Sequence, residues 1–166
     1  MKTLYLLCHA HTTPSGLGLA DFDRPLDKRG QQESQALAQY LTKQKITFDF
    51  VMCSAALRAQ ETLEPLRPVI GTTAIEISES YYNISEDVIL SHLQELPDTI
   101  NKVLYIGHNP GIAFSILRFS TKIPQLVMEG ITPGTLTGFT FDLQQWEDLN
   151  WGQGDIIDIF QPPQES

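Results

Sequence analysis

Short apolar runs alternate along this chain with segments in which apolar residues recur at helical spacing. The runs Thr3–Leu7, Phe48–Cys53 and Lys102–Ile106 each predict a buried strand. Between the first two runs, Asp27 is placed to N-cap a helix over Lys28–Lys45. Strands that alternate with helices predict an α/β domain with a largely parallel sheet.

The rest of the chain extends this pattern. Pro65 and Pro68 are expected to end a helix that starts near residue 57, and Ser85 to cap a later one. The segment 12–25 predicts a loop, and Gly130–Gly134 predicts a turn. The further predicted elements are helices over 57–66, 86–96 and 110–119 and strands over 73–77, 136–143 and 155–160.

The composition is that of a soluble globular domain: 166 residues, 42% hydrophobic and 19% charged. A net charge of −9 and a pI of about 4.7 argue against a nucleic-acid or membrane partner, because phosphate-rich surfaces favour clustered basic residues. Cys8 and Cys53 lie outside any C-x-x-C pair, which predicts free thiols in a reducing compartment. Without a signal-like segment or a long apolar stretch, we expect a soluble cytoplasmic protein.

Three reactive side chains stand just after three of the predicted strands. His9 follows the first run, Arg58 begins the helix after the second, and His108 follows Lys102–Ile106. The carboxyl ends of parallel strands meet at one edge of a sheet, where ligands bind. A neutral imidazole can attack phosphorus, and a guanidinium fork can bind two phosphate oxygens. The three residues therefore predict a site that binds and transfers phosphate.

Two other kinds of site fit the sequence less well. His9 and His11 could share a metal ion, but the (β/α)8 hydrolases with such a pair need about 250 residues. A cysteine nucleophile would need the spacing C-x5-R. Position 14 is a proline, which excludes Cys8, and Cys53 precedes Arg58 by one residue too few. Buried structural thiols are the favoured interpretation of both cysteines.

Several residues near these motifs are interpreted as structural. Tyr81 and Tyr82 are interpreted as packing residues. Asp23 and Arg24 favour an ion pair within the loop, and the alternative is that Arg24 lies close to the phosphate site.

Four motifs, in this order, resemble the histidine phosphatase superfamily. They are most similar to the SixA-like phosphohistidine phosphatases, which are short and lack a cap insertion. The resemblance extends from about Thr3 to Pro162. It implies a phosphoglycerate mutase-like, three-layer α/β/α sandwich with a mostly parallel central sheet, as one compact domain over residues 1–161 with a tail at 162–166. The motifs are Leu7-Cys8-His9-Ala10, Asp23-Arg24-Pro25-Leu26 with Gly30, Ser54–Thr62 and Gly107-His108-Asn109-Pro110-Gly111.

The resemblance also implies a function. It implies a phosphohistidine intermediate on His9, held by Arg58 and His108. Cys8, Arg24 and Asn109 are candidate substrate-binding residues. Water would hydrolyse the intermediate, without a metal or other cofactor. The implied substrate is a phosphorylated protein, such as a histidine-containing phosphotransfer domain in signal transduction, or a small phosphate ester. We expect a monomer.

Two positions depart from the family pattern. The family has an arginine immediately before the nucleophile, where this chain has Cys8. Because hydrogen bonds to charged groups contribute roughly 1.5–3 kcal/mol each, the loss of a bidentate pair predicts a rate lower by about a hundredfold or more. Lys2 and Arg24 are candidates to compensate. The alternative is a weakly active or inactive module that binds phosphate or phosphoproteins on the same fold.

The second departure concerns the proton donor. Relatives often carry a glutamate near a tyrosine after the third strand, where this chain has Tyr81-Tyr82-Asn83. Glu79 and Glu86 are the nearby substitutes, and both are included as substrate-binding candidates. A phosphohistidine substrate has a better leaving group than an alkyl phosphate, which favours phosphohistidine over sugar phosphates.

Overall fold

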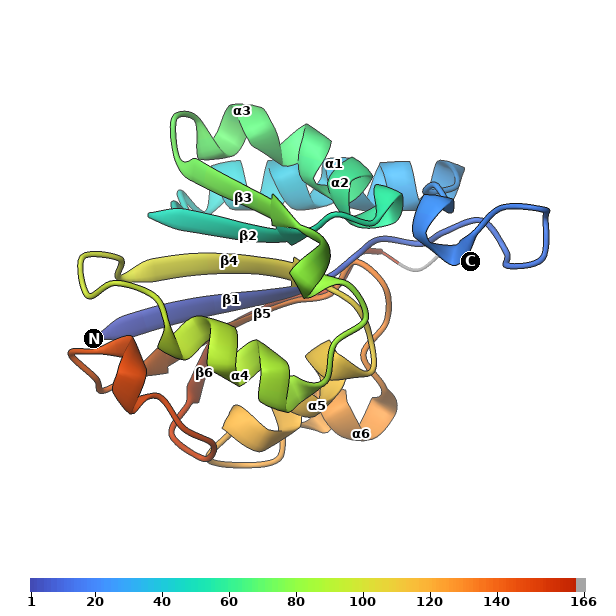
Figure 1. The fold of residues 1–166 in the computed structure, drawn as a ribbon. Helices are drawn as coiled ribbons and strands as arrows, with labels where there is room; N and C mark the ends of the chain where they lie inside the picture. Colours follow the sequence, from blue (N-terminus) through green and yellow to red (C-terminus); the bar gives the residue numbers. More distant parts are fainter. Residues whose placement is uncertain (164–166) are drawn as a thin grey trace.

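One six-stranded sheet forms the centre of the molecule in this computed structural model, which describes residues 1–163 (Figure 1). The strand order is β3-β2-β4-β1-β5-β6. The first four of these strands in space are mutually parallel, while β5 is antiparallel to β1 and β6 to β5. The mostly parallel sheet predicted from the sequence is confirmed. The strands are β1 (Lys2–Cys8), β2 (Phe50–Ser54), β3 (Ala74–Ser78), β4 (Lys102–Gly107), β5 (Leu136–Phe141) and β6 (Asp155–Phe160).

Helices cover both faces of this sheet, which gives the predicted three layers. In Figure 1, α1, α2 and α3 lie above the sheet and α4, α5 and α6 lie below it. Short 3-10 helices η1 (Asp21–Asp23) and η3 (Glu79–Tyr81) lie in the connections after β1 and β3. The helices are α1 (Lys28–Lys43), α2 (Leu57–Leu63), α3 (Arg67–Ile70), α4 (Glu86–Gln94), α5 (Gly111–Phe119) and α6 (Gln125–Glu129).

Strand β1 divides the apolar core into two parts. Leu4, Leu6 and Cys8 pack on the side of α4 and α5, while Tyr5 and Leu7 pack on the side of α1 and α2. Side chains alternate across a strand, so a strand buried on both faces has a continuous apolar run. The run therefore places β1 in the middle of the sheet, where the polar residue that follows it reaches the sheet edge.

Helix caps agree with the sequence in one case and differ in another. The Asp27 carboxylate accepts a hydrogen bond from the Gly30 amide (2.8 Å) and begins α1 as predicted. The expectation that Pro65 and Pro68 end the helix by residue 66 is wrong, because the helical path continues to Ile70. Each proline stands in the first turn of a new short helical segment, where its missing N–H group costs no hydrogen bond.

The start of α4, helix α6 and the C-terminal tail also differ from the prediction or extend beyond it. Ser85 stands at the N-cap of α4, but its side chain makes no capping hydrogen bond. Helix α6 has no counterpart among the predicted elements. The predicted tail at 162–166 lies partly outside the described residues. Among residues 1–163, no helix is long and apolar enough to cross a membrane.

Candidate functional site

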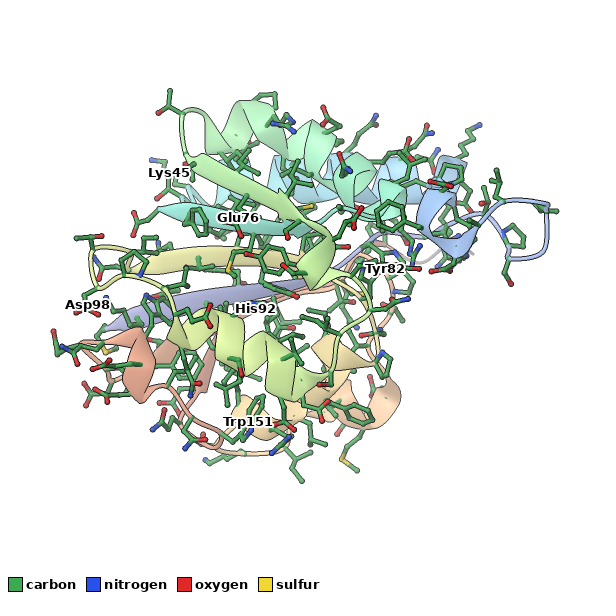
Figure 2. All side chains as sticks on the ribbon, viewed as in Figure 1. Lys45, Glu76, Tyr82, His92, Asp98 and Trp151 are labelled. Carbon is green, nitrogen blue, oxygen red and sulfur yellow. The ribbon has the colours of Figure 1, made fainter. Side chains whose placement is uncertain are left out.

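The carboxyl ends of β1, β2 and β4 bring His9, Arg58 and His108 together, and we call these three side chains the anion cradle. The His9 and His108 rings have centroids 5.2 Å apart. The Tyr82 ring lies 5.5 Å from the His108 ring and 5.8 Å from the Arg58 guanidinium carbon. Figure 2 shows Tyr82 at the end of the sheet where these strands terminate. The two imidazoles and the guanidinium therefore gather at one edge of the sheet.

His9 has the protonation state and orientation of a nucleophile. Its Nδ1 lies 2.8 Å from the Ala10 carbonyl, which can only accept, so Nδ1 carries the proton and Nε2 keeps its lone pair. Burial lowers the pKa of His9 to about 4, and the charges of Arg58 and Arg24 add to this effect. The imidazole is therefore neutral near pH 7.

The backbone after His9 is tied to helix α2. The Thr62 hydroxyl accepts from the Ala10 amide (3.0 Å) and donates to the Arg58 carbonyl (2.7 Å). One buried hydroxyl thus joins the segment that carries the nucleophile to the helix that carries the guanidinium. This positioning contact was not predicted from the sequence.

His108 is held by a buried serine. The Ser54 hydroxyl lies 2.7 Å from His108 Nε2 and also accepts from the Ala56 amide (3.3 Å). Among the described residues the Ser54 hydroxyl proton has no acceptor other than Nε2, so the tautomer that satisfies the hydroxyl is the one with Nε2 accepting and the proton on Nδ1. That Nδ1 is buried and has no hydrogen-bond partner among the described residues. Burial, together with the charges of His9 and Arg58, lowers the pKa of His108 to about 3.

Arg58 is 3% exposed, and its two terminal nitrogens both donate hydrogen bonds to one residue, Asp21. Its Nη1 donates to the Asp21 carbonyl (2.6 Å) and its Nη2 to the Asp21 carboxylate (3.0 Å). Its Nε is buried without a partner in the described part of the chain. Two nitrogen atoms of the cradle, Arg58 Nε and His108 Nδ1, are therefore buried without a hydrogen-bond partner among residues 1–163.

Asp21 joins several groups around the cradle. Besides Arg58, its carboxylate accepts from the Tyr82 hydroxyl, from Arg24 (3.0 Å to Nη2) and from the Asn83 amide (3.5 Å). The hydrogen bond from Tyr82, followed by that from Arg58, holds the pKa of Asp21 well below its usual range. Sequence reasoning missed Asp21. It interpreted Tyr82 as a packing residue, and the Tyr82 ring does pack edge-on against Phe22 (5.0 Å between ring centroids), while its hydroxyl also bonds to Asp21.

Arg24 supplies a second cation close to the cradle. Its positive charge contributes to the lowered pKa of both His9 and His108. The predicted ion pair with Asp23 is wrong: the partner is Asp21, three residues earlier, and Arg24 also donates to the Thr13 carbonyl (2.9 Å). Of the two residues considered as compensation for the absent arginine, Arg24 is the one near the site.

Lys2 lies at the opposite end of β1 and does not compensate. Its ammonium donates to the Asp98 carbonyl (2.7 Å), the Ile100 carbonyl (3.0 Å) and the Asn101 side chain (2.9 Å). Figure 2 shows Asp98 at the end of the sheet away from Tyr82. A strand as long as β1 separates its two ends by about 20 Å.

Cys8 lies beside the cradle but faces the core. Its side chain is 2% exposed within the apolar cluster that includes Leu6 and Ile112. Burial raises the pKa of the thiol to about 12, so Cys8 stays neutral and provides no cation.

The remaining predicted site residues make contacts outside the cradle. The Asn109 amide donates to the Ile131 carbonyl (2.9 Å) and its oxygen accepts from the Ala113 amide (3.2 Å). Glu86 pairs with Arg118 (3.5 Å), and Glu79 is exposed at the start of η3. Neither glutamate contacts the cradle within residues 1–163.

The metal alternative rested on His11, whose ring contacts a carboxylate elsewhere. His11 Nδ1 lies 2.6 Å from the carboxylate of Asp27, the N-cap of α1. The pair therefore links the segment after His9 to the start of α1.

Comparisons with known proteins agree with this architecture. A family model described as the histidine phosphatase superfamily (branch 1) matches residues 4–85. An uncharacterized chloroplastic protein of Arabidopsis thaliana is 31% identical over 121 residues, which cover 66% of this chain and 55% of that protein. The chain thus spans just over half the length of this curated relative. An uncharacterized protein of Mycobacterium leprae is 25% identical over 87% of this chain and 90% of its own.

Solved structures match over nearly the whole chain. The proposed phosphohistidine phosphatase SixA of Nakamurella multipartitia superposes with a TM-score of 0.81 at 25% identity, covering 97% of this chain and 96% of that one. The corresponding protein of Agrobacterium tumefaciens gives a TM-score of 0.79 at 21% identity, covering 97% and 98%.

Proposed function

We propose that this chain, which belongs to the histidine phosphatase superfamily, hydrolyses phosphohistidine on a protein through a phosphorylated intermediate on His9. Phosphatase chemistry is general to the superfamily, and the SixA-like fold supports the narrower choice. The observation that carries the proposal is the neutral His9, with Nε2 unprotonated, beside Arg58 and His108.

The first chemical step transfers the phosphoryl group to the protein. The lone pair of His9 Nε2 forms a bond to phosphorus, and the bond to the leaving group breaks with its electron pair on the leaving nitrogen. Arg58 Nε and His108 Nδ1–H are the buried donors suited to the phosphoryl oxygens, whose charge they stabilise in the transition state. The Ala10 carbonyl keeps the proton on Nδ1 and stabilises the imidazolium that forms.

The second step returns His9 to its starting state. Water attacks phosphorus, the P–Nε2 bond breaks, and its electron pair returns to Nε2. Both protons of the water stay with the phosphate, which leaves as dihydrogen phosphate, so the neutral imidazole with Nδ1–H is restored. The cycle uses the three side chains of the cradle, the Ala10 carbonyl and one water molecule, and we propose that it proceeds without a cofactor.

Phosphohistidine is the favoured substrate because its leaving imidazole needs less assistance than an alkoxide. The two carboxylates expected as proton donors, Glu79 and Glu86, do not contact the cradle. We propose a phosphotransfer domain or a phosphorylated carrier protein as the partner, in a soluble cytoplasmic setting, with this chain acting as a monomer.

The test is phosphate release from a phosphotransfer protein carrying radiolabelled phosphohistidine. We expect release by the native chain and none by His9→Ala, with near-native release by His92→Ala, a histidine on α4 outside the cradle. Release by His9→Ala at the native rate would contradict the proposal.

A second function is favoured by the state of Cys8. Its buried neutral thiol occupies the position of the family arginine, so the fold could bind a phosphorylated ligand without hydrolysing it. This alternative predicts no turnover by the native chain and turnover by Cys8→Arg. If neither the native chain nor Cys8→Arg released phosphate, the identification of His9, Arg58 and His108 as a catalytic site would be wrong.

A further inference from the structure

A carboxylate stands in direct contact with the guanidinium of a cradle suited to anions. Asp21 bonds to Arg58 through both its carbonyl and its carboxylate, and it shares its carboxylate with Arg24 and Tyr82. Among the charged groups that shift the pKa of both His9 and His108, Asp21 is the acidic one. A fixed negative charge there repels a dianionic phosphoryl group and would by itself weaken phosphate binding. Its position beside Arg58 therefore calls for an explanation in terms of the substrate.

We infer that Asp21 is a specificity-determining residue that selects phosphoryl donors whose leaving group carries a positive charge. These are N-phosphoryl compounds with a protonated imidazole or amine, in preference to phosphate esters. The inference rests on the proposed function and adds the residue that distinguishes the two substrate classes.

The depth of the groups supports this division of roles. Arg58 and His108 are 3% and 5% exposed, whereas the Asp21 side chain is 45% exposed. Asp21 occupies the Nη atoms of Arg58 and leaves the buried Nε free. A phosphoryl group can therefore bind Arg58 Nε and His108 Nδ1 while Asp21 stays bound. The leaving group then extends toward solvent, on the side where the carboxylate is exposed.

The chemistry of N-phosphoryl compounds gives the carboxylate its effect. In a phosphohistidine protonated at its second ring nitrogen, the P–N bond breaks with its electrons moving to nitrogen, and a neutral imidazole departs. In phosphoramidate the protonated nitrogen departs as neutral ammonia. An ionised carboxylate favours the protonated substrate in both cases. The donors around Asp21 keep it ionised, so it acts as a negative charge and does not deliver a proton.

Two simpler roles predict different behaviour. If Asp21 only blocks Arg58, its neutralisation should speed every substrate by a similar factor. If Asp21 only positions Arg58 and Arg24, its neutralisation should slow every substrate by a similar factor. Selection by charge requires the ratio between substrate classes to change.

The experiment compares phosphoramidate with p-nitrophenyl phosphate, whose leaving group departs as an anion without a proton. For each protein the readout is kcat/KM for phosphoramidate divided by kcat/KM for p-nitrophenyl phosphate. This ratio does not depend on the fraction of the protein that is folded. In Asp21→Asn we expect this ratio to fall about tenfold to a hundredfold, the effect of losing one charged contact. Asp21→Glu should keep the native preference for phosphoramidate.

The matched control is Asp23→Asn, which removes the same charge from the same short helix at an exposed position. Its ratio should stay within about twofold of native. A native ratio in Asp21→Asn would overturn the inference and leave the proposed function intact. A native chain that hydrolyses neither compound and carries no phosphate on His9 would overturn the proposed function, and the inference with it.

Discussion

Removal of the Ser54 hydroxyl tests whether His108 must be held in one orientation and one tautomer, because the variant keeps the His108 side chain and removes only the group that contacts it. Ser54 is fully buried and its hydroxyl lies 2.7 Å from His108 Nε2, which is itself buried. Ser54→Ala leaves Nε2 without a partner, and a buried unsatisfied group costs about 1–3 kcal/mol. Without the hydroxyl the proton can move to Nε2, so Nδ1 would present a lone pair to the phosphoryl oxygens. Since 1.4 kcal/mol corresponds to tenfold, we expect kcat/KM to fall by about tenfold or more.

The assay pairs urea unfolding with steady-state hydrolysis of p-nitrophenyl phosphate. The matched control is Ser115→Ala on α5, a fully buried serine whose hydroxyl donates to the Gly111 carbonyl (2.8 Å). Ser115→Ala should lower the free energy of unfolding modestly and leave kcat/KM near native. The reasoning is refuted if Ser54→Ala keeps kcat/KM within twofold of native, or loses no more activity than the control.

Three further predictions follow from the charges around the cradle. Because the pKa of His9 is lowered to about 4, the acid limb of kcat/KM, corrected for ionisation of the substrate, should lie near pH 4. A limb near pH 6.5 would contradict the burial of His9 as the cause of its lowered pKa. Between about pH 6.5 and 4 the unfolded chain binds more protons than the native one. The free energy of unfolding should therefore fall as pH drops through this window, and His108→Asn should reduce the slope of urea titrations there. Arg24→Gln should lower kcat/KM by about tenfold, whereas Lys2→Met should affect stability alone; equal losses of activity would exclude Arg24 as the compensating cation.

The sequence predicts the sheet and the cradle well because both depend on local patterns. Each apolar run forms a strand, and the residue after a parallel strand must reach the same edge of the sheet. His9, Arg58 and His108 therefore come together from segments far apart in the chain. Asp27 is also predictable, because a helix cap is a contact between residues three apart.

The acidic partner of the cradle could not be predicted in the same way. Asp21 and Tyr82 lie in the connections after β1 and β3, whose paths depend on contacts between distant segments. The acidic residue three positions before Arg24 was the available signal, since one turn brings such a pair together. The burial of Cys8, by contrast, was predicted, and it agrees with the alternation of Cys8 with Leu4 and Leu6 along β1.

The site of covalent phosphorylation tests the account most directly. Rapid quenching of the native chain during turnover of phosphoramidate, followed by digestion and mass spectrometry under alkaline conditions, should find phosphate on His9. His9→Ala should carry none, while any adduct that forms in His108→Asn should also be on His9. Phosphate found on another side chain, or turnover without any adduct at early times, would contradict a nucleophilic His9.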